Sequence, residues 1–129
     1  MTTTFSAADP QAFLEAATPA ARRRDGLQLS ALAQRVTGQA PRMFGTAIVG
    51  FGEHRYTHDS GRSGITPTIG FSPRKTALVV YLANGLPDPT VLARLGPHST
   101  GVGCLYLKDL QAVDVDVLTQ ILTTTWQAG

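Results

Sequence analysis

Two adjacent cations, Arg74 and Lys75, follow a turn signal between two apolar, β-branched runs. Pro73 presets φ at the second position of a turn, and the side chain of Ser72 suits the first position. The stretch from Ser72 to Lys75 therefore predicts the tip of a β-hairpin that carries two positive charges. Because arginine offers forked donors and turn amides add more, we expect this tip to bind an anion.

A second small polar loop contains His98, Ser99 and Thr100, with Gly96 and Gly101 on either side. Its hydroxyl, imidazole and amide groups make it another candidate for anion binding. An ordinary solvated turn explains each of the two loops when it is taken alone, and that alternative stays open.

Aromatic and basic side chains recur at alternate positions of three predicted strands, residues 54–58, 76–82 and 104–108. Alternate residues of a strand point to the same face of its sheet. We expect helices to cover the apolar set and the polar set to line a cleft or an interface on the other face. Half-buried packing with a wet hydroxyl is the alternative for each tyrosine. The polar set is His54, Tyr56, His58, Tyr81, Cys104, Tyr106 and Lys108.

Metal ligation is not expected from these histidines or from the cysteine. His54 and His58 are four residues apart on a predicted strand, which places their Cα atoms about 13 Å apart. Cys104 has no partner at zinc spacing. Among the scattered carboxylates only Asp114 and Asp116 stand close together, and Asp114 also suits a helix cap.

Nucleophilic catalysis has one candidate, the thiol of Cys104, with His98 and Lys108 near it in the sequence. A lone cysteine in an apolar strand is usually an inert core residue. Residues 50–52, Gly-Phe-Gly, lack the neighbours of a dinucleotide-binding fingerprint. The sequence therefore favours a protein that is not an enzyme, and catalysis by Cys104 remains an alternative.

The composition predicts one globular domain in a reducing compartment. The 129 residues are 43% apolar and 16% charged, and the net charge of +2 is too small to imply a nucleic-acid partner. The only charge run, residues 22–24, is expected on a solvated helix surface because consecutive helical residues point in different directions. A single cysteine, no signal-like N-terminus and no membrane-length apolar run indicate a cytoplasmic protein without a membrane partner.

The order of elements predicts an α+β, two-layer sandwich. Short loops between the first strands favour an antiparallel sheet of about five strands, with helices packed on one face. Residues 1–8 are expected to form a flexible N-terminus, and residues 9–129 a single domain. The expected helices cover residues 10–17, 20–36, 89–95 and the stretch after Asp114; the expected strands cover residues 44–49, 54–58, 66–71, 76–82 and 104–108.

Five stretches together resemble the YdhG-like proteins of bacteria, also called domain of unknown function 1801. They are residues 38–43, 48–52, 70–75, 95–101 and 104–106, and Phe-Ser-Pro-Arg-Lys at 71–75 is the most specific of them. The resemblance covers nearly the whole chain and implies a frataxin-like fold, with helices on one side of an antiparallel sheet. It implies little about activity, although some relatives are described as iron chaperones.

This chain departs from those families at positions that matter for ligands. Frataxin-type iron binding uses a dense acidic ridge, and this region offers only Asp9, Glu15 and Asp25, with three arginines between the last two. Pro97 and Ser99 stand where YdhG-like proteins usually or often carry lysine, which makes the second loop less basic. The family usually has tryptophan at the position of Phe44.

The sequence thus favours a binding module without a cofactor, which holds a small anionic ligand or a protein partner on its open sheet face. Iron binding by family analogy is the alternative. A homodimer interface built by the tyrosine face is a further one. The residues assigned to the ligand site are His54, Tyr56, Ser72, Arg74, Lys75, Tyr81, His98, Thr100, Tyr106 and Lys108.

Overall fold

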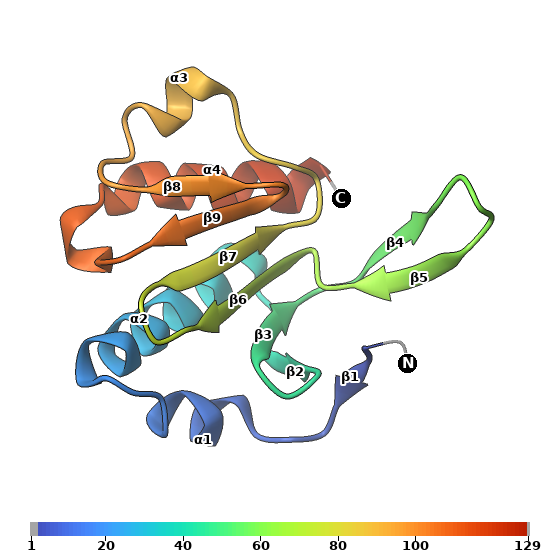
Figure 1. Ribbon diagram of the computed structural model, residues 1–129, viewed down its shortest axis with the longest axis horizontal. Helices are drawn as coiled ribbons and strands as arrows, with labels where there is room; N and C mark the ends of the chain where they lie inside the picture. Colours follow the sequence, from blue (N-terminus) through green and yellow to red (C-terminus); the bar gives the residue numbers. More distant parts are fainter. Residues whose placement is uncertain (1–2, 129) are drawn as a thin grey trace.

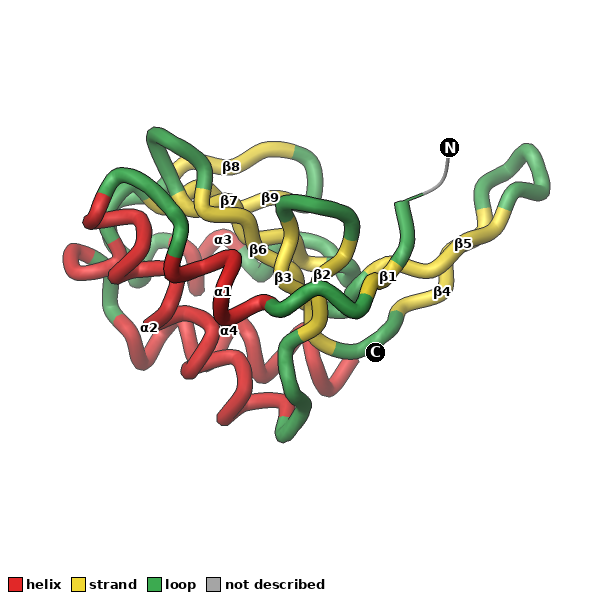
Figure 2. The backbone as a smooth tube through the Cα atoms, turned by 90° about the horizontal axis from the view of Figure 1, so that it is seen from below, coloured by secondary structure: helices red, strands yellow, loops and turns green. Residues whose placement is uncertain are grey.

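The computed structural model describes residues 3–128, in which an antiparallel sheet of seven strands is covered on one face by helices (Figures 1 and 2). This confirms the predicted α+β sandwich. The sheet order is β1-β2-β3-β6-β7-β9-β8. The strands of this sheet are β1 (Phe5–Ser6), β2 (Arg42–Phe44), β3 (Ile48–Phe51), β6 (Ile69–Pro73), β7 (Leu78–Leu82), β8 (Ser99–Gly101) and β9 (Cys104–Leu107).

The helices follow the sequence prediction closely at their starts and less closely at their ends. Asp9 caps α1, its side chain accepting a hydrogen bond from the Gln11 amide, and Asp114 caps α4 in the same way. The third predicted helix is shorter than expected. The helices are α1 (Pro10–Glu15), α2 (Ala20–Thr37), α3 (Pro89–Leu92) and α4 (Val115–Ala128), with a short 3₁₀ turn η1 (Leu110–Ala112).

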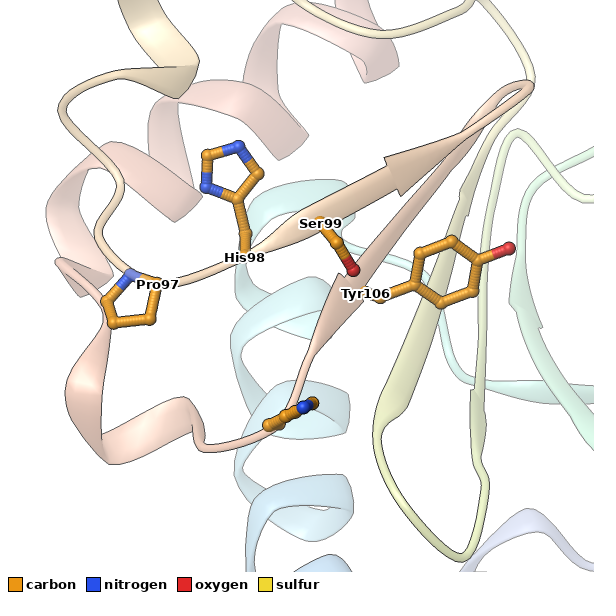
Figure 3. A pocket seen from close by; sticks show the side chains of 5 residues that line it. Pro97, His98, Ser99 and Tyr106 are labelled. Atoms are coloured by element: carbon orange, nitrogen blue, oxygen red, sulfur yellow. The ribbon is translucent and has the colours of Figure 1, made fainter.

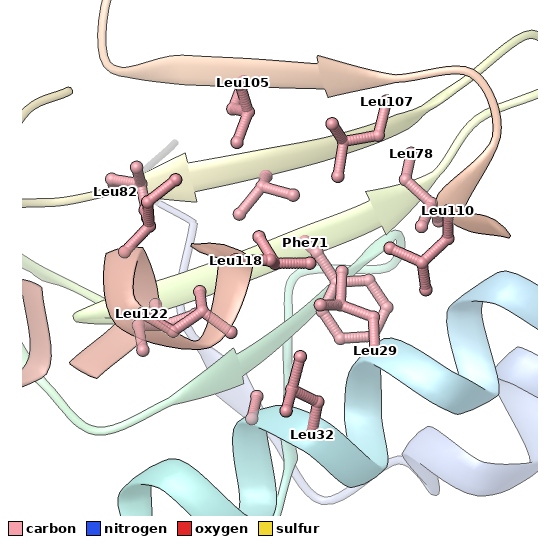
Figure 4. Packing of buried hydrophobic residues seen from close by; sticks show 14 of the residues in the cluster. Leu29, Leu32, Phe71, Leu78, Leu82, Leu105, Leu107, Leu110, Leu118 and Leu122 are labelled. Atoms are coloured by element: carbon pink, nitrogen blue, oxygen red, sulfur yellow. The ribbon is translucent and has the colours of Figure 1, made fainter. Parts of the chain in front are cut away.

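The core lies between the sheet and the pair α2 and α4 (Figure 4). On α2, Leu29, Leu32 and Ala33 are buried as the helical spacing predicts. One strand residue from each of β3, β6, β7 and β9 faces them in register. Burying such side chains supplies the main stabilisation of the two-layer arrangement. The four residues in register are Val49, Phe71, Val80 and Leu105.

The strand count differs from the prediction because two expected strands are each divided. Gly45, with φ of 67°, turns the chain between β2 and β3, where one strand was predicted over residues 44–49. Pro67 interrupts the predicted strand 66–71, since proline has no N–H for a strand ladder. The predicted polar loop around His98 is also partly a strand, β8, which pairs with β9.

The division at Pro67 separates a hairpin from the main sheet. β4 (His54–Thr57) pairs only with β5 (Ser63–Thr66), and this two-stranded arm projects beyond the sheet (Figure 1). The prediction that residues 54–58 form a strand of the main sheet is therefore wrong. β1 lies within the stretch for which a flexible N-terminus is predicted, and it pairs with β2; residues 1 and 2 lie outside the described residues.

The predicted solvated surface of the arginine run is wrong for Arg22 and holds for Arg24, whose side chain is 55% exposed. Arg22 is 6% exposed and donates through Nη1 to the Lys108 carbonyl oxygen at 2.9 Å. Asp25 is fully buried and accepts hydrogen bonds from the Leu110 amide at 3.0 Å and from Arg24 Nε at 3.0 Å. The side-chain amide of Gln111 is 3.1 Å from the same carboxylate. These contacts join α2 to the segment after β9.

We expect the Asp25 carboxylate to make the fold sensitive to acid. Burial alone would raise the pKa of Asp25, but the hydrogen bonds from Leu110, Gln111 and Arg24 outweigh it and lower the pKa below 3.8. A carboxyl whose pKa is lower in the folded than in the unfolded chain stabilises the fold at neutral pH. That stabilisation is lost as the pH falls through the folded-state value.

Asp25→Asn is therefore expected to lower the free energy of unfolding at neutral pH by about 3 kcal/mol. It should also flatten the pH dependence of that free energy between about pH 5 and pH 2. Urea unfolding across this range measures both effects. Asp59→Asn, a change in an exposed turn, is the control; equal pH profiles for the two variants would contradict the prediction.

Candidate ligand-binding face

The face of the sheet opposite α2 and α4, called the open face below, carries the polar residues that strand alternation predicts. Its residues form three rows across the strands, because the register aligns them. The pairing ends at Leu78 of β7 and Leu107 of β9. One residue further along each strand, Arg74 and Lys108 lie on either side of Ala77. The first row is Gly50, Gly70, Tyr81, Cys104 and Gly101; the second is Ser72, Val79, Tyr106 and Ser99; the third is Arg74, Ala77 and Lys108.

Arg74 lies back over the open face and is held there by two neutral groups. Its Nε donates to Ser72 Oγ at 3.0 Å, and one terminal nitrogen lies 3.4 Å from the Tyr81 hydroxyl. Ser72 is only 1% exposed, so its hydroxyl is a fixed acceptor beneath the guanidinium. Because neither partner is charged, the positive charge of Arg74 stays available to a ligand.

The turn that carries Arg74 is displaced from the predicted one. Ser72 and Pro73 still pair with β7, and the turn is closed by the Arg74 amide bonding to the Ala77 carbonyl oxygen at 2.9 Å. The tip is therefore residues 74–77 and not residues 72–75. Lys75 is exposed at this tip and does not join the rows of the open face.

A shallow hollow of about 310 Å³ lies beside β8 and β9, lined by Ser99, Tyr106, Lys108, His98 and Pro97. Ser99 and Tyr106 are paired across the two strands, and Figure 3 shows the His98 ring pointing away from both. His98 Nδ1 lies 2.8 Å from the Gly96 carbonyl oxygen. The hollow thus offers the Lys108 ammonium and the Ser99 hydroxyl, with the imidazole at its margin, whereas the Tyr106 hydroxyl leans over Gly101.

Thr100 does not belong to the predicted site. It pairs with Leu105, whose side chain is fully buried against the helices, so the alternation of β8 turns Thr100 away from the open face. The prediction treated residues 98–100 as a loop, in which all three side chains could meet one ligand. Because these residues belong to a strand, Ser99 and Thr100 point to opposite faces of the sheet.

An apolar groove of about 280 Å³ crosses the open face between β2–β3 and β7–β9. The ring of Tyr81 lines it, so Tyr81 connects the groove to the Arg74 guanidinium. The half-buried thiol of Cys104 also lies in its wall. The other lining residues are Phe44, Ile48, Thr66, Pro67, Gly70, Leu82, Ala83, Val102 and Gly103.

His54 and Tyr56 are displaced from the predicted face, because they lie on the projecting hairpin β4–β5. Tyr56 packs against His58, with 5.0 Å between the ring centroids. Tyr56 and His58 line a separate hollow of about 460 Å³, together with Arg62 and Phe44, whereas His54 lines none of the three hollows described here. The hairpin forms an independent part of the same surface.

Two features of this surface, the apolar groove and Arg62, are not indicated by the sequence pattern. The groove is assembled from residues of separate strands and from Pro67, so no local pattern announces it. Arg62 lies in the turn between β4 and β5, so its place beside Tyr56 and His58 depends on the pairing of those two strands.

Within residues 3–128, no three His, Cys, Asp or Glu side chains lie close enough together to hold a metal ion. Cys104 faces apolar neighbours and Tyr81 in the groove, and no base lines that groove. None of the helices in the described part of the chain is both long and apolar enough to cross a membrane.

Comparison with protein-family models, with curated proteins and with solved structures finds no match for this chain.

Removal of the Ser72 hydroxyl should release Arg74 from the open face. Ser72→Ala deletes the acceptor beneath the guanidinium, at an expected stability cost of about 1 kcal/mol. The exchange rate of the Arg74 Nε–H with solvent, measured by NMR, should rise. Ser99→Ala, which alters an exposed hydroxyl in the same row, should leave that rate unchanged. An unchanged rate in Ser72→Ala would show that Ser72 does not hold Arg74.

Proposed function

We propose that this chain is a binding domain that takes an acidic small molecule with an apolar body on its open face. The contact between Arg74 and Tyr81 carries the proposal, because it places a cation at the edge of an apolar groove. The acid of the ligand binds Arg74, and its apolar body displaces water from the groove.

Lys108 gives the acid a second cation on the other side of Ala77. The sheet spacing of about 4.8 Å per strand puts the two backbones near 10 Å apart, within reach of two long side chains that converge on one anion. Ser99 of β8, which lines the same hollow as Lys108, adds a hydroxyl donor. The charge of a monoanion is therefore bound at one end of the site, and its apolar body is bound by the apolar surface that it buries in the groove.

The charge on this surface supports an acidic ligand. All acidic residues of the chain lie within residues 3–128, and none of them lines the groove or the hollows beside β8 and beneath the hairpin. Arg24 and Arg42, by contrast, are paired with Asp25 and Glu53. Charge complementarity on the open face therefore favours an anion over a cation or a neutral molecule.

Iron delivery, the alternative drawn from the family resemblance, finds less support in this arrangement. Asp25 is committed to the α2 network, and Asp9 caps α1. The YdhG-like assignment and the cytoplasmic location remain parts of the proposal that rest on the sequence. Anaerobic titration with ferrous iron tests the alternative directly, and measurable heat would favour it over the anion.

Octanoate is a suitable first probe, with octanol and inorganic phosphate as controls that lack the acid or the apolar body. Octanoate should raise the melting temperature and give a titration heat, because binding to the native state alone stabilises it. Octanol and phosphate should bind about tenfold more weakly or not at all, since each lacks one of the two contributions.

Arg74→Ala/Lys108→Ala should weaken octanoate binding by tenfold or more, roughly the loss of one to two charge-assisted hydrogen bonds. Arg35→Ala/Arg55→Ala removes the same charge from exposed positions outside the groove and should leave the affinity unchanged. If both double variants lost the same affinity for octanoate, the effect would come from net charge alone, and the proposed site would be wrong. Sedimentation of the ligand-free protein distinguishes a homodimer formed through this face.

A further inference from the structure

The apolar groove does not end at the edge of the main sheet. Phe44 and Thr66 line both the groove and the hollow beneath the β4–β5 hairpin, so the two adjoin at these residues and are together called the depression below. Pro67, which follows β5, forms part of its wall. A ligand that enters at Arg74 and follows the groove therefore arrives beneath the hairpin.

The far end of this depression is cationic and aromatic. Arg62 lines it, and its guanidinium forms no ion pair within residues 3–128; Asp59, in the same turn, is outside ion-pair distance. Tyr56 and His58 lie beside Arg62 with their rings in contact. The Ser63 hydroxyl adds a further donor. This is a set of donors without a carboxylate, which suits an anion.

The hairpin is held in place against the main sheet at both of its connections. At one connection Gly52 has φ of 72° and lies against the ring of Trp126 on α4, where a Cβ would collide with that ring. At the other, Pro67 covers Gly50 so closely that a Cβ there would be 2.6 Å from Pro67 Cγ. Arg42 and Glu53 pair at 3.2 Å beside the first connection. These contacts fix the base of the hairpin, and the turn that carries Arg62 is closed by the His58 amide donating to the Arg62 carbonyl oxygen at 2.7 Å.

We propose that the ligand of the open face is a dianion, with an acidic group at each end of an apolar middle. This inference rests on the proposed function and extends it: the first acid binds Arg74 and Lys108, the middle lies in the groove, and the second acid binds Arg62. Charge complementarity identifies the occupant, because Arg74 lies beside the groove at Tyr81, Arg62 lines the adjoining hollow, and no charged side chain lines the groove between them.

Straight-chain dicarboxylates from adipate to dodecanedioate, each compared with the monocarboxylate of equal carbon number, test the proposal by titration calorimetry. A dicarboxylate that spans the depression should bind about tenfold tighter than its monocarboxylate, since it gains a second charge-assisted contact. The fluorescence of Trp126, the single tryptophan of the chain, should respond to that dicarboxylate because Trp126 packs at the hairpin connection.

Arg62→Ala should abolish the advantage of the dicarboxylate and leave monocarboxylate affinity unchanged. Arg55→Ala is the matched control, because Arg55 is exposed on the same hairpin and alternates to the face opposite Tyr56. If monocarboxylates bind and no dicarboxylate binds tighter, or if Arg62→Ala keeps the advantage, the dianion inference is wrong and the proposed function stands. If neither class binds, the proposed function fails and the inference fails with it.

Discussion

The buried carboxylate of Asp25 is the polar contact on which the joining of the two layers depends. It accepts hydrogen bonds from the Leu110 amide, Arg24 and Gln111, while Arg22 binds the Lys108 carbonyl oxygen. A buried charge without partners is strongly destabilising, so α2 and the segment after β9 are fixed relative to one another. Because that segment begins at Lys108, the same contacts position a cation of the open face.

The two faces of the sheet differ because alternation sends all the leucines of β7 and β9 to the helix side and both tyrosines to the open face. Leu78, Val80 and Leu105 are fully buried against the helices. On the other side the tyrosines of the same strands remain half-buried, and Arg74 lies across Ser72. This side needs no helix to cover it, because water hydrates its polar side chains and the groove exposes only a limited apolar area. A rigid sheet with a fixed arginine is a preorganised surface for a ligand.

Sequence reasoning was accurate where local chemistry decides the structure and inaccurate where pairing partners decide it. The helix caps at Asp9 and Asp114 and the periodicity of α2 depend on neighbours within one or two turns, and the sequence predicted them correctly. The hairpin β4–β5 was assigned to the main sheet because alternation identifies a strand without identifying the strand beside it. For the same reason strand alternation places Tyr81, Tyr106 and Lys108 on one face, where the structure has them, and also places His54 and Tyr56 there, which the structure has on the hairpin.

The sequence by itself determined the class of fold, the division of β7 and β9 into an apolar and a polar set, and the presence of cations beside Pro73. These follow from residue spacing of two in strands and 3.6 in helices. Only the tertiary structure decided that Arg22 and Asp25 are buried, that Arg74 contacts Tyr81, and that Phe44 and Thr66 connect two hollows. Each of these features depends on contacts between side chains of distant segments. The register of the sheet fixes those contacts, and residue spacing along the chain does not encode them.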